Sequence, residues 1–284
     1  MLERMRSSRR VRRFTRNRLA LVGLGIVWVI ILTSALASVI SPYDPIEHNY
    51  DEMLQPPSGR HLMGTDDLGR DILSRVLYGS RYALLIGVAV VLLELAVGAS
   101  MGFIAGYFGG KVDTVIMRVV DMVLAIPTLI LAIAIAGALG GGLWVMIIAI
   151  AVAGWGEFSR LVRAQVLSLK ELTYVEAVRA TGAGNARIIF RHILPNSMGP
   201  VLVYTTLYMP TAILWSAALS FLGLGAQPPT PEWGSIIAEG RGFISYAWWI
   251  ATFPGLAIML TTFGFNCVGD GLRDALDPRF SRNV

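Results

Sequence analysis

The sequence predicts an all-α, polytopic membrane protein with six transmembrane helices, and three observations predict it. Of its 284 residues, 55% are hydrophobic and 15% are charged, whereas soluble domains carry about 25% charged residues. The apolar residues gather in six runs of about twenty residues, the length that a helix needs to cross a bilayer. The arginines crowd into the amino terminus, which is a topology signal and not a nucleic-acid footprint.

Residues 1–18 form a basic tail with a single acid, Glu3. The positive-inside rule keeps such a tail in the cytoplasm, where it can also lie on anionic lipid headgroups. The apolar run that follows predicts a first transmembrane helix over residues 19–41. The segment Ala35-Leu36-Ala37 is similar to a signal-peptide cleavage site, but a signal core is about 7–15 residues long. We therefore favour an uncleaved anchor over a cleaved signal peptide.

Residues 42–80 turn polar, acidic and rich in proline, which fits the outer side of the membrane. Thr65 or Asp66 can cap a helix, and apolar residues recur at helical spacing from Ile72 onwards. We expect an extracytoplasmic segment with an interfacial helix packed on the membrane core. A direct role of its charges in substrate binding is the less favoured alternative.

Residues 81–270 are expected to contain five further helices, with apolar runs at 82–108, 112–139, 143–162, 200–224 and 248–268. The first of these runs is rich in glycine and alanine, which let membrane helices pack closely. Glu94 lies near its middle, and an ionisable group at that depth is a functional candidate. A pore-lining or substrate-facing role stands beside a structural hydrogen bond to a neighbouring helix. In the next run, Arg118 and Asp121 are spaced to neutralise each other.

A polar island at residues 170–196 separates the fourth and fifth runs. Residues 174–181 favour a short helix, residues 182–184 allow a sharp turn, residues 186–192 favour a second helix, and Pro195 is expected to end it. One face is built from residues with almost no side chain, namely Ala177, Ala180, Gly182, Ala183 and Ala186. Another protein could approach this backbone closely, so we expect a docking element. The alternative is an ordinary connector between two helices.

The island resembles a known motif. Glu176-Ala177, Gly182 and Ile193-Leu194-Pro195 resemble the EAA loop in the membrane subunits of binding-protein-dependent ABC importers, although Val178 replaces a usual alanine and Ile193 comes one place late. With Arg191-His192 in front, the stretch is similar to the dipeptide/oligopeptide/nickel permease family. Residues 61–75, HLMGTDDLGRDILSR, resemble the amino-terminal signature of its C-type subunit.

The resemblance implies the transmembrane domain of a type I ABC importer, with a cytoplasmic coupling loop at residues 170–196. The loop residues that it singles out as contacts for an ATPase are Glu176, Ala177, Gly182, Ala183, Arg191, His192, Ile193, Leu194 and Pro195. It further implies a permease subunit that forms, with a homologous second permease, the path for short peptides or a related small solute. Two ATP-binding subunits and an extracytoplasmic solute-binding protein would complete the assembly in the bilayer, without nucleic acid.

The chain itself offers no site for ATP. Neither Lys111 nor Lys170 lies in a Gly-x-x-x-x-Gly-Lys-Ser/Thr loop. We therefore expect no enzymatic activity, no catalytic residue, no metal site and no cofactor in this chain, with ATP and magnesium bound by partner subunits.

The loop after the fifth run is rigid and rich in proline, and the count of crossings places it outside. Gln227, Pro228 and Trp233 are candidates for contact with the binding protein or for an external gate, and a re-entrant structural plug is equally open. Residues 271–284 form a second cytoplasmic tail. An even number of spans places both termini in the cytoplasm, beneath the cytoplasmic membrane of a bacterium or archaeon.

The alternative function is a secondary transporter or channel driven by an ion gradient. Such a protein needs ionisable residues at the midplane of several helices and often contains inverted repeats. The sequence shows Glu94 and little else of this kind. A membrane scaffold without transport activity would leave the docking element unexplained.

Overall fold

The fold is a computed structural model that describes residues 14–276, and over these residues the chain forms helices and loops without a strand. Five of the helices are long and apolar enough to cross a membrane, and a bent pair supplies a sixth crossing if it counts as one span. The predicted all-α polytopic fold is therefore confirmed. Most of the predicted basic tail and residues 277–284 lie outside the described part of the chain.

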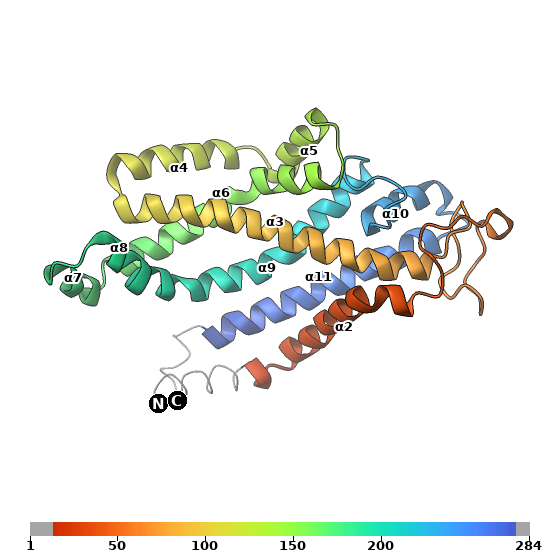
Figure 1. Cartoon of the computed structure of the whole chain (residues 1–284), viewed down its shortest axis with the longest axis horizontal. Coiled ribbons are helices and arrows are strands. Elements are labelled where there is room, and N and C mark those ends of the chain that lie inside the picture. The colour runs from red at the N-terminus through yellow and green to blue at the C-terminus, as the bar shows by residue number, and fades with distance from the viewer. Residues whose placement is uncertain (1–13, 277–284) are drawn as a thin grey trace.

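The long helices run side by side along the molecule (Figure 1): α2 (Arg18–Ile40), α3 (Ile72–Phe108), α6 (Leu143–Lys170), α9 (Leu194–Phe221) and α11 (Trp249–Leu276). Helix α3 packs chiefly against α6, and α11 packs against α2 and α9. Their inward faces share a core that includes Val90, Ile150 and Leu219, while leucines and valines such as Leu92 and Val39 remain exposed. Exposed apolar side chains suit a bundle that is surrounded by lipid. Helices are also stable there, because they satisfy their own backbone hydrogen-bonding groups.

The two ends of the described chain lie together. The side-chain amide of Asn17, which caps α2, donates to the Asp274 carboxylate in the last turns of α11 at 3.3 Å. Since α2 begins where α11 ends, both helix ends lie on one side of the bundle.

The expected third span is not a straight helix. It is divided into α4 (Gly110–Leu124) and α5 (Thr128–Ala138), which meet at 82°. Pro127 lies at the break. Proline lacks an N–H and disfavours helical geometry in the residue before it, so it interrupts the helix. The expected pairing of Arg118 with Asp121 is also wrong, since Arg160 of α6 binds the Asp121 carboxylate at 2.6 Å.

Glycines bring α3 and α6 into close contact, as predicted for the second span. A Cβ atom at Gly102 would lie 2.2 Å from the carbonyl oxygen of Ser159, and one at Gly98 would lie 2.4 Å from that of Trp155. Backbone atoms cannot move away as a flexible side chain can. The two helices are therefore fixed at a spacing that only glycine permits.

The prediction of a separate interfacial helix before residue 81 is wrong, because α3 runs unbroken from Ile72 to Phe108. Asp71, and neither Thr65 nor Asp66, caps it by accepting from the Ser74 amide at 2.8 Å. The polar residues near residue 80, where we expected the interfacial helix to end and the second span to begin, lie inside one continuous helix. Arg81, for example, donates from Nε to the Ser34 carbonyl of α2 at 2.6 Å.

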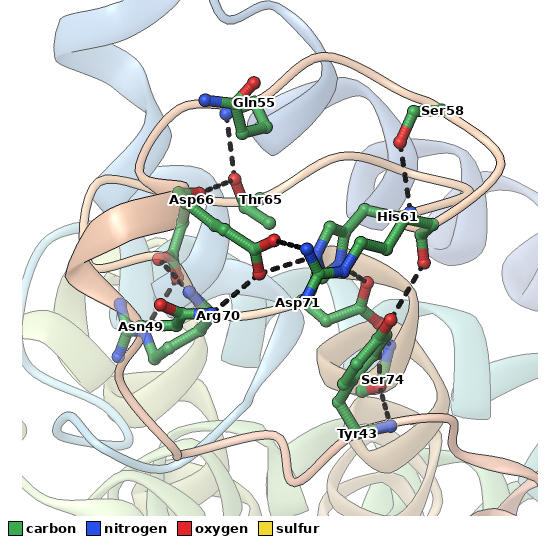
Figure 2. A network of polar contacts seen from close by, with 12 residues as sticks. Tyr43, Asn49, Gln55, Ser58, His61, Thr65, Asp66, Arg70, Asp71 and Ser74 are labelled. Atoms are coloured by element: carbon green, nitrogen blue, oxygen red, sulfur yellow. Dashed lines mark hydrogen bonds and ion pairs between the residues drawn. The ribbon is translucent and has the colours of Figure 1, made fainter.

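Four charged side chains, three of them buried and one, Glu239, half-buried, form a cluster where residues 42–71 meet α3 and α10 (Trp233–Gly240). The Asp66 carboxylate accepts from Arg70 Nε at 2.7 Å and from Arg75 Nη1 at 2.5 Å, and the Asp66–Arg70 contact is visible in Figure 2. Glu239 of α10 binds the same two arginines at 2.8 and 2.6 Å. Two positive and two negative charges balance within the protein.

His61 extends this polar network (Figure 2). Its Nδ1 lies 2.9 Å from Asp71 Oδ1, and its Nε2 lies 3.2 Å from Glu52 Oε2. These side chains are occupied with one another, which supports a structural role for the charges of residues 61–75.

We predict that Gly102→Ala destabilises the protein although alanine favours helix formation. The added methyl group meets the α6 backbone, and overpacking of this kind costs about 1–3 kcal/mol. Thermal unfolding in detergent measures the effect. Gly25→Ala in α2 is the control, because no described residue outside its own stretch of helix has an atom within 4 Å of the Cβ position. Equal midpoints for the two variants would contradict the close contact.

We also predict that Asp66→Asn lowers the unfolding midpoint far more than Asp67→Asn. Asp66 is fully buried between two arginines, and breaking such a pair costs about 3–5 kcal/mol. Burial, and then the neighbouring Asp66 charge, raise the pKa of Asp67. Because the folded chain holds this proton more tightly than the unfolded chain, ionising Asp67 destabilises the fold as pH rises. Asp67→Asn should thus be neutral or stabilising at neutral pH, and a loss equal to that of Asp66→Asn would refute the assignment.

Candidate functional site

The predicted docking element projects from one end of the bundle, opposite to α10 (Figure 1). Helix α6 ends at Lys170, and α7 (Thr173–Ala180), a turn, and α8 (Asn185–Ile188) follow. A short π-helix, η2 (Ile189–Ile193), then leads into α9. Two short helices joined by a glycine turn were predicted, and both are present.

Pro195 does not end the second helix as predicted. It lies in the first turn of α9, so the chain continues as helix to Phe221. The backbone is helical on both sides of Pro195, because η2 continues directly into α9 and the Leu194 N–H bonds to the Ile189 carbonyl. The fifth span consequently begins at Leu194 and not near residue 200.

The inner side of the element is firmly attached to the bundle. Val175, Ile188 and Ile193 are completely buried and pack in one cluster with Tyr107 of α3 and with α6 and α9. The Tyr107 hydroxyl donates to Asn185 Oδ1 at 2.7 Å, and Lys170 Nζ donates to the Tyr107 carbonyl at 2.9 Å. The element is thus an extension of the ends of α3, α6 and α9.

The outer side presents most of the predicted docking residues. Glu176, Ala177, Gly182, Arg191 and Pro195 are exposed, whereas Ala183, His192 and Leu194 are half-buried. Ile193 is the exception, because it is fully buried and anchors the element from inside. A contact role for the Ile193 side chain is therefore excluded in this arrangement.

Gly182 makes the turn possible. Its φ of +82° favours glycine, and among residues 14–276, apart from its chain neighbours, no atom lies within 4 Å of the place that a Cβ would occupy. The small residues therefore leave an open surface in front of the turn.

Glu94 lies inside the bundle between α3, α6 and α9, with none of its surface exposed. Its Oε1 and the Tyr208 hydroxyl lie 2.0 and 2.9 Å from the position that a Cβ at Gly154 would take. Among residues 14–276, neither oxygen of Glu94 has a hydrogen-bond partner. Glu94 thus lies buried beside the Tyr208 hydroxyl of α9 without a hydrogen bond of ordinary geometry, and the two roles expected for it remain predictions.

A second acidic residue escaped the sequence analysis. Glu157 lies at the middle of α6, half-buried, and accepts a hydrogen bond from the Tyr204 hydroxyl of α9 at 2.6 Å. The Tyr204 ring stacks on Tyr208 and meets Phe158 edge to face. The signal that singled out Glu94, an acid in an apolar run, applies equally to Glu157.

The three residues predicted as external contacts in the outer loop differ in exposure. Gln227 and Pro228 are exposed and border a cavity of about 320 Å³, together with Glu239 and Arg241. Trp233 is 2% exposed, and its indole N–H donates to the Val76 carbonyl of α3 at 2.9 Å. An external contact through Trp233 is therefore wrong, because its ring fills the space above Gly79 of α3. Trp233 thus packs α10 onto α3, and the re-entrant plug remains a prediction.

The family models match most of the chain. Residues 98–282 match the model of the binding-protein-dependent transport system inner membrane component, and residues 8–57 match that of the N-terminal TM domain of oligopeptide transport permease C.

Curated relatives are similar over nearly their whole length. The dipeptide transport system permease protein DppC of Alkalihalophilus pseudofirmus is 49% identical over 93% of this chain and 87% of the relative. The di/tripeptide transport system permease protein DppC of Pseudomonas aeruginosa is 46% identical over 94% of this chain and 90% of the relative. The oligopeptide transport system permease protein OppC of Bacillus subtilis is 45% identical over 95% of this chain and 88% of the relative.

A solved structure shares the fold. A chain of the MetNI methionine ABC transporter, in an inward-facing conformation, superposes with a TM-score of 0.59 at 19% identity, over 72% of this chain and 98% of that one. Fold, family models and relatives agree, and the chain belongs to the family of inner-membrane permease components of binding-protein-dependent ABC importers.

Proposed function

We propose that this chain is a permease subunit of an ATP-driven importer of short peptides. It pairs with a homologous permease, receives two ATP-binding subunits at its coupling loop, residues 170–196, and accepts its solute from an extracytoplasmic binding protein. ATP and magnesium are bound by the partner subunits, so the chain itself is not an enzyme. The names of its relatives, which include dipeptide, di/tripeptide and oligopeptide permeases, favour peptides as the solute.

The observation that carries the proposal is the exposed, small-residue face of α7 and α8 on a firmly attached base. Ala177 and Gly182 leave the backbone open to a partner, while Val175 and Ile188 are locked into the bundle. A surface of this kind can receive a protein and transmit its movement.

The attachment suggests how movement is transmitted. The element continues into α6 on one side and into α9 on the other, and Tyr107 ties it to α3. Displacement of α7 and α8 by the ATP-binding subunits would therefore shift three membrane helices together. ATP binding would thus change the populations of inward-open and outward-open states.

The proposed topology follows from the same arrangement. The coupling loop faces the cytoplasm, where ATP is available, and the joined ends of α2 and α11 point toward the same end of the bundle (Figure 1). Both termini are then cytoplasmic, in the cytoplasmic membrane of a prokaryotic cell. The segment of residues 42–71 and α10 are then on the outer side.

The test of the function is uptake of radiolabelled alanyl-alanine into proteoliposomes that contain the whole complex. We expect uptake that requires the binding protein and ATP and persists when ionophores remove all ion gradients. Uptake that collapses with ionophores and ignores ATP would establish the gradient-driven alternative, for which Glu94 and Glu157 would be the candidate ion carriers.

We further predict that Gly182→Trp abolishes copurification of the ATP-binding subunits, because an indole ring fills the open surface at the turn. Gly182→Ala is the matched control, since it carries the same strain at positive φ without the bulk. Affinity purification in mild detergent, followed by mass spectrometry, measures the association. Full recovery of the ATPases with Gly182→Trp would show that docking occurs elsewhere.

A further inference from the structure

A cavity of about 580 Å³ lies between α6, α9 and α11 toward the coupling-loop end of the bundle. Most of its wall is apolar, including Leu161, Val203 and Leu207. Three polar side chains interrupt that wall, one from each helix: Gln165, Tyr204 and Arg273. Apolar walls with a few placed polar groups are typical of small-molecule sites.

A negative charge lies next to one of the residues that line the cavity, Tyr204. Tyr204 lines the wall and holds Glu157 at 2.6 Å from its hydroxyl. Glu157 also follows the lining face of α6, because it precedes Leu161 by one helical turn. The Tyr204 hydroxyl binds Glu157 Oε2, and no hydrogen bond is made to Oε1 within residues 14–276.

The basic residues near Glu157 are engaged elsewhere. Arg160 binds Asp121, and Arg163 binds Asp113, both of α4. In the described part of the chain, Glu157 therefore has a hydroxyl as its partner and no cation. A carboxylate at the middle of a membrane helix calls for a positive partner, and beside aromatic rings a ligand ammonium is suited to that role.

A positive charge also lines the cavity, on an exposed side chain. Arg273 of α11 lines it, and within residues 14–276 its guanidinium makes no ion pair. The nearby Asp274 accepts from Asn17. A free guanidinium binds a carboxylate through two parallel hydrogen bonds.

The α6 residues beside the cavity give a length, from Glu157 to Gln165, which lines the wall. Gln165 lies eight residues beyond Glu157, which corresponds to about 12 Å along α6. An extended peptide spans about 3.3–3.6 Å per residue, so two or three residues with the reach of an arginine side chain cover this distance.

We propose that this cavity binds a zwitterionic di- or tripeptide, with the amino group at Glu157 and Tyr204 and the terminal carboxylate at Arg273. The assignment rests on the proposed function. It means that the permease, in addition to the external binding protein, recognises both free ends of the peptide.

The experiment uses the detergent-solubilised complex without the binding protein, so that any selectivity belongs to the membrane subunits. The photoreactive dipeptide alanyl-p-benzoylphenylalanine is crosslinked in the light, and labelled segments are mapped by mass spectrometry. Alanyl-alanine, its N-acetyl derivative and its amide compete for the site. The variants are Glu157→Gln and Arg273→Gln, with Asp121→Asn as a control that removes a carboxylate outside the cavity.

We expect labels on α6, α9 and α11, and competition by alanyl-alanine that is about tenfold stronger than by either blocked derivative, since each loses a charged hydrogen bond. Glu157→Gln should erase discrimination against the N-acetyl derivative, and Arg273→Gln should erase discrimination against the amide. Asp121→Asn should behave like the wild type.

Equal competition by free and blocked peptides in the wild type, or labels confined to other segments, would overturn the assignment even if the variants failed to assemble. ATP-driven uptake of alanyl-alanine by the complete wild-type system separates the two proposals. Intact uptake with unselective labelling refutes the cavity alone, whereas absent uptake refutes the peptide importer.

Discussion

The packing of α3 against α6 is the contact on which the rest of the structure depends. Gly98 and Gly102 bring the two backbones together over the middle of the bundle. At one end of this pair, Tyr107 and Lys170 hold the coupling loop. At the other end, the first turns of α3 carry Arg75, which binds Glu239 of α10, and the Val76 carbonyl, which accepts from Trp233 of α10. A change of spacing between α3 and α6 would therefore reach both faces of the membrane.

The charges of the protein divide into two groups with different meanings. Those in the outer segment are numerous, yet Asp66, Arg70, Arg75 and Glu239 neutralise one another in a largely buried cluster. Such a cluster fixes the geometry of the loops and leaves little charge for a solute. Those within the helices are few, and Glu94 and Glu157 have no cation beside them in the described residues. The paired outer charges and the unpaired acids inside the bundle are consistent with a path that opens and closes through helix movement.

The same helix connects the two functional regions. Helix α6 carries Glu157 at its middle and leads into α7 at its end, and α9 carries Tyr204 and follows directly from η2. A displacement of the coupling loop would thus act on both partners of the Glu157–Tyr204 hydrogen bond. Coupling between ATP hydrolysis and the solute would then need no pathway longer than two helices.

The sequence by itself determined the helical class, the positions of most apolar runs and the two short helices around Gly182, because hydrophobicity over twenty residues and glycine at a turn act locally. It also carried the family resemblance at Glu176-Ala177 and in residues 61–75. The tertiary structure decided what depends on neighbours far along the chain: the 82° break at Pro127, the burial of Trp233 against α3, and the partner of Asp121. Glu157 shows the reason most clearly. Its residue type and its place in an apolar run are visible in the sequence. Its neighbours are not, because only the packing of three helices brings Tyr204 of α9 and Arg273 of α11 around one cavity beside it.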